Sequence, residues 1–97
     1  MKKQMMTNDQ TRFFELLDNF DRLKHHWNKE SRTFNPESFE QDLKVMSSGE
    51  RYMAKFFASV WLNESESYPF DVLDAIKVID LKSRKLVISW LAKPFFP

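Results

Sequence analysis

The chain has no cysteine and only one glycine among its 97 residues. Without cysteine the protein can form no disulfide, no thiolate zinc site and no cysteine nucleophile. Glycine reaches positive φ angles without steric cost, so tight hairpins and phosphate-binding loops are usually built from it. One glycine therefore argues against both features and excludes the Walker and dinucleotide-binding motifs.

Long apolar runs are also missing. The longest, residues 86–92, is interrupted by Ser89, and it falls far short of the ~20 residues that a membrane-spanning helix needs. Met1, Lys2 and Lys3 are soon followed by polar residues, which are Gln4, Thr7, Asn8 and Asp9, whereas a secretion signal continues with an apolar core. We therefore predict a cytoplasmic protein without a membrane partner.

The composition is that of a globular domain, with 42% hydrophobic and 30% charged residues. A chain of this length can bury one compact core. We predict a single helical domain over residues 1–97.

The first helix is predicted from its start signal and its periodicity. Thr7 and Gln10 have the spacing of a capping box, in which each side chain bonds a free backbone N–H of the first turn. Apolar residues then recur at helical spacing up to Trp27. The pattern predicts one long amphipathic helix over roughly residues 8–30.

Two further helix starts follow. Asn35 is a favoured N-cap before Pro36, and Phe34 and Phe39 occupy the positions of a hydrophobic staple, which predicts a helix over 36–45.

Ser47 and Glu50 form a second capping-box pattern and predict a helix over 48–62. The lone glycine, Gly49, falls in its first turn, where glycine costs less than in a helix interior.

The second half begins with a polar loop over 63–69. Asp71 and Asp80 can each cap a following helix, although β-branched residues within 75–90 leave a β-hairpin there as the alternative. The predicted fold is all-α, a compact bundle of about four to five helices.

His25 and His26 are the only histidines. Neighbouring residues on a helix point about 100° apart, so a helical pair cannot face one metal ion together. We predict that both lie on a solvated helix surface. No metal site, cofactor or catalytic residue is predicted, because no serine, histidine or carboxylate has the context of a known catalytic motif.

Aromatic residues are unusually frequent, and ten of the fifteen are phenylalanine. The terminal segment places Phe95 and Phe96 between two prolines. These rings either fold back onto the domain or, together with Trp27 and Tyr68, form a partner-binding surface of the kind that supplies binding hot spots.

Charge is unevenly distributed within a net total of +1. Residues 81–97 carry a net charge of +4, and residues 63–80 carry a net charge of −4. Lys82, Arg84 and Lys85 could bind nucleic-acid phosphates. The alternative is a solvated helix face whose bases pair with the neighbouring acidic segment.

The pattern of the second half resembles small accessory proteins of bacterial phages, plasmids and integrative elements. The residues that carry this resemblance within 47–97 are Gly49-Glu50, Phe56, Ser59-Val60-Trp61, Pro69-Phe70-Asp71, Asp74-Ala75, Asp80, Arg84, Trp90-Leu91-Ala92, Pro94-Phe95 and Pro97. The resemblance implies a protein that binds and blocks host machinery, as anti-CRISPR proteins do. It supplies no catalytic residues, and the near-neutral charge departs from inhibitors that mimic DNA.

The predicted function is therefore a non-enzymatic protein-binding module that inhibits a bacterial defence complex, with a bacterial protein or protein complex as its partner. The alternative is a small nucleic-acid-associated regulator. A homodimer is also expected to be accessible, because amphipathic helices with surplus aromatic residues often complete their burial in a second copy.

Overall fold

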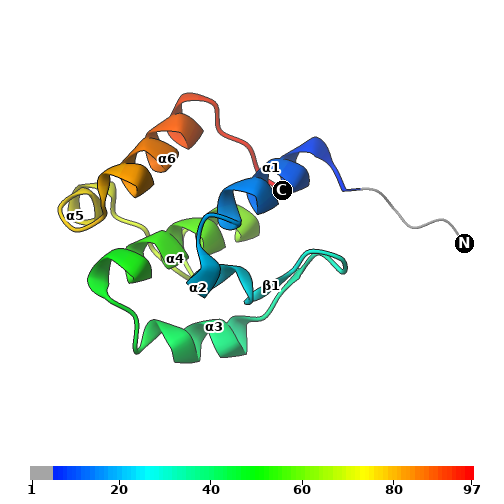
Figure 1. Ribbon diagram of the computed structural model, residues 1–97, viewed down its shortest axis with the longest axis horizontal. Coiled ribbons are helices and arrows are strands. Elements are labelled where there is room, and N and C mark those ends of the chain that lie inside the picture. Colours follow the sequence, from blue (N-terminus) through cyan, green and yellow to red (C-terminus); the bar gives the residue numbers. More distant parts are fainter. Residues whose placement is uncertain (1–5) are drawn as a thin grey trace, which may run out of the picture.

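The computed structural model describes residues 6–97, so Lys2, Lys3 and Gln4, on which the prediction about a secretion signal partly rests, lie outside it. Six helices and one two-stranded sheet make up the described part (Figure 1). Their order is α1 (Asn8–Leu17), α2 (Asp21–Lys24), β1 (Trp27–Asn28), β2 (Thr33–Phe34), α3 (Pro36–Leu43), α4 (Ser48–Leu62), α5 (Val72–Ile76) and α6 (Leu81–Ala92). The fold is mostly helical but not all-α. In residues 6–97, every helix is too short or too polar to cross a membrane.

Both predicted capping boxes are confirmed. The backbone N–H of Gln10 donates to Thr7 Oγ1 at 3.1 Å, and that of Thr7 donates to Gln10 Oε1 at 3.0 Å. The same exchange joins Ser47 and Glu50 at the start of α4, at 3.0 and 3.3 Å. These bonds satisfy N–H groups that have no partner within the helix.

The other predicted helix starts are confirmed as well. Asn35 caps α3, and the staple rings of Phe34 and Phe39 lie 5.1 Å apart. Asp71 caps α5 and Asp80 caps α6. Residues 75–90 are therefore helical apart from a short link, and the alternative hairpin over that range is wrong.

The prediction of one continuous helix over 8–30 is wrong, because α1 ends at Leu17, residues 21–24 form the separate helix α2, and residues 27–28 form a strand. Asn19 turns its side-chain amide back to the carbonyl of Leu16 at 3.1 Å, which satisfies an acceptor at the end of α1. Phe20 then adopts φ −125° and ψ 85°, outside the helical region, and its ring packs 5.4 Å from that of Phe57. Burial of this ring against α4 outweighs the helical periodicity of the local sequence.

The hairpin forms where the sequence predicts continued helix. Trp27 pairs with Phe34, and their ring centroids lie 4.7 Å apart. Asn28 Oδ1 accepts the backbone N–H groups of Glu30 and Ser31, and Arg32 takes a positive φ of 55°. The side-chain bonds of Asn28 and the positive φ of Arg32 thus close the loop without the glycine that usually supplies a positive φ angle.

The core is centred on α4, which lies in the middle of the molecule (Figure 1). Phe57 packs against Phe13 of α1, with ring centroids 5.6 Å apart, and Phe56 packs against Trp90 of α6, at 5.5 Å. The two neighbouring rings of α4 thereby hold α1 and α6 on different sides of the same helix.

Gly49 explains how α4 can start beside the link between α5 and α6. A Cβ atom at this position would lie 3.0 Å from the backbone carbonyl oxygen of Val78. This contact is tighter than most carbon–oxygen contacts, so the backbone at Val78 would have to shift by a few tenths of an ångström. The glycine serves close packing as well as marking a helix start.

We predict that Gly49→Ala lowers the free energy of unfolding by about 1 kcal/mol, because crowding against Val78 outweighs the better helix propensity of alanine. Urea unfolding followed by circular dichroism measures the change. The neighbouring, exposed Ser48→Ala variant is the control and should stay within about 0.5 kcal/mol of the parent. Equal or greater stability of Gly49→Ala would contradict the close-packing role.

Candidate functional site

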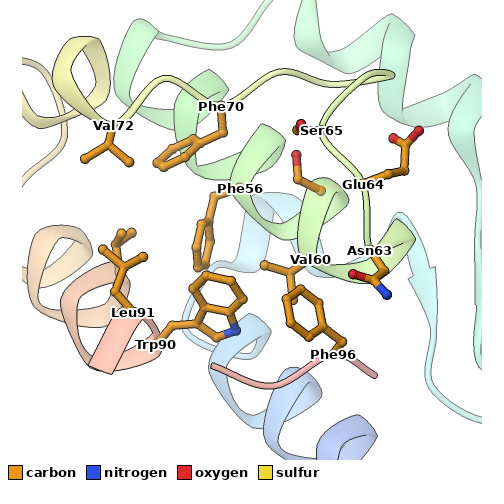
Figure 2. A pocket seen from close by; sticks show the side chains of 12 residues that line it. Phe56, Val60, Asn63, Glu64, Ser65, Phe70, Val72, Trp90, Leu91 and Phe96 are labelled. Atoms are coloured by element: carbon orange, nitrogen blue, oxygen red, sulfur yellow. The ribbon is translucent and has the colours of Figure 1, made fainter. Parts of the chain in front are cut away.

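An apolar groove of about 340 Å³ lies between α4, α6 and the segment that precedes α5 (Figure 2). We call it the α4–α6 groove. Eight of its twelve side chains are apolar, and four are polar or charged. The lining residues are Phe56, Ser59, Val60, Asn63, Glu64, Ser65, Phe70, Val72, Val87, Trp90, Leu91 and Phe96.

The C-terminal segment folds back and forms part of this groove. The indole N–H of Trp90 donates to the carbonyl oxygen of Phe95 at 3.0 Å. The Phe95 ring is buried, and the guanidinium of Arg12 lies 4.3 Å from its centroid. Phe96 points the other way, packs edge-on against Trp90 and remains 46% exposed. The C-terminal segment is therefore docked through the buried Phe95 ring, and it leaves the Phe96 ring partly exposed.

The four predicted partner-binding residues do not gather on one surface. Phe96 alone lines the groove. Trp27 is buried in the hairpin, and Tyr68 packs on Phe39 while its hydroxyl donates to Glu40 at 2.8 Å. Burial, together with Glu40, raises the pKa of Tyr68 to about 12.

Exposed apolar side chains are concentrated around the groove and on α5 and α6. Ten large hydrophobic residues are exposed in the described chain, and eight of them fall within residues 72–96. These eight are Val72, Leu73, Ile76, Val78, Leu81, Ile88, Leu91 and Phe96. One stretch of the chain thus carries most of the apolar surface that a partner could bury.

The basic and acidic segments form no ion pair with each other within residues 6–97, so the predicted ion pairs between them do not form. The segments still interact at Asp80, whose pKa is lowered by its hydrogen bonds with Ser83 and further by the charges of Lys82 and Arg84. Lys82 and Lys85 are exposed, whereas Arg84 is half-buried in the crevice between α5 and α6. The three predicted phosphate ligands therefore do not share one face.

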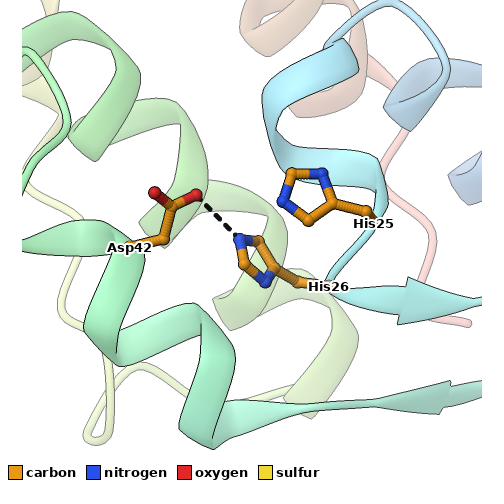
Figure 3. A group of neighbouring side chains, drawn as sticks. All are labelled: His25, His26 and Asp42. Carbon is orange, nitrogen blue, oxygen red and sulfur yellow. Dashed lines mark hydrogen bonds and ion pairs between the residues drawn. The ribbon is translucent and has the colours of Figure 1, made fainter.

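A second candidate site joins His25, His26 and Asp42 (Figure 3). His25 is exposed, but His26 is only 4% exposed, so the prediction that both lie on a solvated surface is wrong for His26. Nε2 of His26 lies 2.9 Å from Asp42 Oδ2, and Nδ1 lies 2.9 Å from Ser38 Oγ. Arg22 Nη2 lies 2.8 Å from the other oxygen of Asp42.

These contacts change the acidity of Asp42. The hydrogen bond from His26 lowers the pKa of the carboxyl group, and Arg22 lowers it further, against the opposing effect of burial. The charged carboxylate is therefore stabilised in the folded state, where it ties α2 and the start of the hairpin to α3.

Sequence reasoning missed both Asp42 and most of the groove. Asp42 lies sixteen positions from His26, and a lone carboxylate on a helix carries no local sign of its partner. In the sequence, Phe56 and Trp90 occupy ordinary core positions of two separate helices, and Phe70 precedes a third helix. Only the packing of α6 across α4 turns their edges into the walls of a groove.

We predict that Asp42→Asn lowers the free energy of unfolding at neutral pH by about 1–3 kcal/mol, because the partners of the carboxylate lose a charged acceptor. A carboxyl whose pKa is depressed by folding adds stability that is complete above its unfolded pKa, about 3.9, and is lost as the pH falls through its lower folded pKa. The parent should therefore lose stability below about pH 4, and the variant should lose less there.

Urea unfolding between pH 2 and pH 7 measures both effects. Asp18→Asn, at an exposed position after α1, is the control and should follow the parent within about 0.5 kcal/mol. Parallel pH profiles for the parent and Asp42→Asn would show that Asp42 contributes nothing to the fold.

Comparisons with protein-family models, with curated proteins and with solved structures found no match to this chain.

Proposed function

We propose that this protein is a non-enzymatic protein-binding module whose binding surface is the α4–α6 groove with the exposed apolar side chains of α5 and α6. The observation that carries the proposal is the concentration of eight exposed large hydrophobic residues within residues 72–96. Val72, Leu91 and Phe96 of these eight line the groove. Exposed apolar side chains at a preformed groove are characteristic of protein-binding sites, because the partner removes them from water.

The occupant we propose is an amphipathic helix of the partner. Glu64 is the one charged residue that lines the groove, beside the polar side chains of Asn63 and Ser65. A helix with an apolar stripe and a basic residue at the end of the stripe complements this lining. Phe96 and Leu91, exposed at the groove, would contact the stripe.

In line with the sequence resemblance, we propose a bacterial protein or protein complex as the partner and inhibition of a bacterial defence complex as the result of binding. A second copy of the chain is the competing occupant, which the experiment below distinguishes.

We predict that Leu91→Glu weakens binding of the protein partner at least tenfold, because a charge replaces an apolar side chain at the groove. Leu91 is 52% exposed, so the substitution should leave thermal stability nearly unchanged. Val45→Glu is the matched control, since Val45 is 70% exposed but lies after α3 and outside the groove. The parent and the control should recover the same stoichiometric partner from a bacterial lysate, and Leu91→Glu should not.

Titration of the purified partner against all three proteins then measures the affinities. Equal affinity for Leu91→Glu and Val45→Glu would overturn the assignment of the groove. Light scattering on the isolated chain measures its oligomeric state and tests whether a second copy occupies the groove. A dimer that Leu91→Glu dissociates and Val45→Glu does not would assign the groove to a second copy instead.

A nucleic-acid-associated regulator is the second candidate function. Lys82 and Lys85 are exposed and lie three positions apart on α6, and neither forms an ion pair within the described residues. The Lys82 ammonium lies 5.9 Å from the centroid of the Phe20 ring, and both side chains are exposed enough to contact neighbouring phosphates.

If this function holds, duplex DNA or RNA should bind with an affinity that falls steeply with salt, and a Lys82→Ala, Lys85→Ala double variant should bind at least tenfold more weakly at low salt. Half-buried Arg84 is replaced separately, because its loss can also disturb packing. Exposed Lys29 and Lys44, replaced together, provide the control. A flat fluorescence-anisotropy titration at low salt would exclude this function.

A further inference from the structure

The structure places three metal-ligating side chains at one point between the end of α2 and the end of α3 (Figure 3). One donor atom from each of His25, His26 and Asp42 lies within 4.8 Å of the others. We propose that these three residues bind a divalent transition-metal ion of the Zn²⁺ class. The proposal is independent of the groove and of its partner.

The end of α2 is what allows two neighbouring histidines to serve one ion. In a continuous helix their side chains would diverge by about 100°. Here His25 caps the end of α2, and the chain then leaves the helix toward β1. The two rings consequently lie with centroids 4.3 Å apart, both beside α3 (Figure 3).

His26 is already oriented as a ligand. Ser38 Oγ can donate its single proton to the carbonyl oxygen of Asn35, at 3.3 Å, and then accepts a proton from Nδ1 of His26. A partner of this kind on the far ring nitrogen is what orients and fixes the tautomer of metal-bound histidines. Nε2 is then the nitrogen that points toward Asp42.

The contact between Nε2 and Asp42 Oδ2 places two ligand atoms at one point. Without a metal, Nε2–H can donate to this oxygen at 2.9 Å while Nδ1 accepts the hydroxyl proton of Ser38. A metal ion bound to Nε2 and Oδ2 would take the place of that hydrogen bond, with the ring proton on Nδ1 and the Ser38 hydroxyl turned to Asn35. The neutral imidazole is the form that binds metals.

The distances suit a small ion after modest adjustment. Two ligand atoms at tetrahedral angles around Zn²⁺ lie about 3.4 Å apart, given bonds of about 2.0–2.1 Å. This value falls between the 2.9 Å from His26 to Asp42 and the 4.8 Å limit of the cluster. The exposed ring of His25 is free to turn inward, and two imidazoles with one carboxylate suit zinc, copper or nickel better than calcium or magnesium.

Arg22 limits how strongly the site can bind a metal ion. Its guanidinium holds Asp42 Oδ1, so the carboxylate offers the ion a single oxygen, and the nearby positive charge opposes a cation. His25, His26 and Asp42 supply three ligands, and the fourth position of a tetrahedral site is left for water on the side where His25 is exposed. We therefore expect reversible binding that depends strongly on each ligand.

Zn²⁺ titration by calorimetry on the tag-free protein tests the site. We expect one Zn²⁺ per chain, and we expect His25→Ala to bind at least tenfold more weakly. The exposed side chain of His25 makes no hydrogen bond within the described residues, and the backbone bond of His25 to Leu23 does not need the ring, so His25→Ala should unfold like the parent when no metal is present. Asp42→Asn should also bind more weakly, and exposed Lys29→Ala should bind like the parent.

Two further measurements separate a metal site from a purely structural histidine. Zn²⁺ should raise the unfolding temperature of the parent and not that of His25→Ala. Co²⁺ should give the parent the visible absorption of a low-coordinate nitrogen and oxygen site. Absence of Zn²⁺ binding to the parent, or equal binding by His25→Ala, would overturn the proposal.

Discussion

The packing of neighbouring aromatic rings on α4 is the interaction on which the rest of the structure depends. Phe57 faces α1 and the non-helical turn at Phe20, while Phe56 faces Phe70 and Trp90. One helix thereby fixes elements from both ends of the chain. Because the rings interlock edge to face, a displacement of α4 would disturb contacts on both of its sides at once.

The groove and the histidine cluster are separate consequences of this arrangement. Phe56 and Trp90 bury one another but leave their edges as the floor and wall of the groove. On another part of the molecule, the turn anchored by Phe20 ends α1 and is followed by the short α2, which delivers His26 to α3. A ligand at one place therefore has no direct contact with the other.

The sequence predicted the capped helix starts and the end of α4 at Leu62, but it missed the end of the first helix at Leu17. The caps at Thr7, Asn35, Ser47, Asp71 and Asp80 all formed, because each depends on a side chain and a backbone group three residues away. The hairpin was missed because Asn28 and Arg32 replaced glycine in its loop. Of the predicted binding residues, only Phe96 proved to line the groove, since burial of Phe95 and Trp27 depends on partners far along the chain.

By itself, the sequence determined a mostly helical chain without thiol chemistry, the positions where its helices begin, and the separation of basic from acidic residues near its end. Tertiary structure alone decided that the first helix stops at Leu17 and that His26 contacts Asp42. It also decided that the Phe95 ring is buried in the core while the Phe96 ring stays partly exposed. The reason is the range of the interactions. Capping is local, whereas ring burial and ion pairing join residues whose proximity only the folded chain creates.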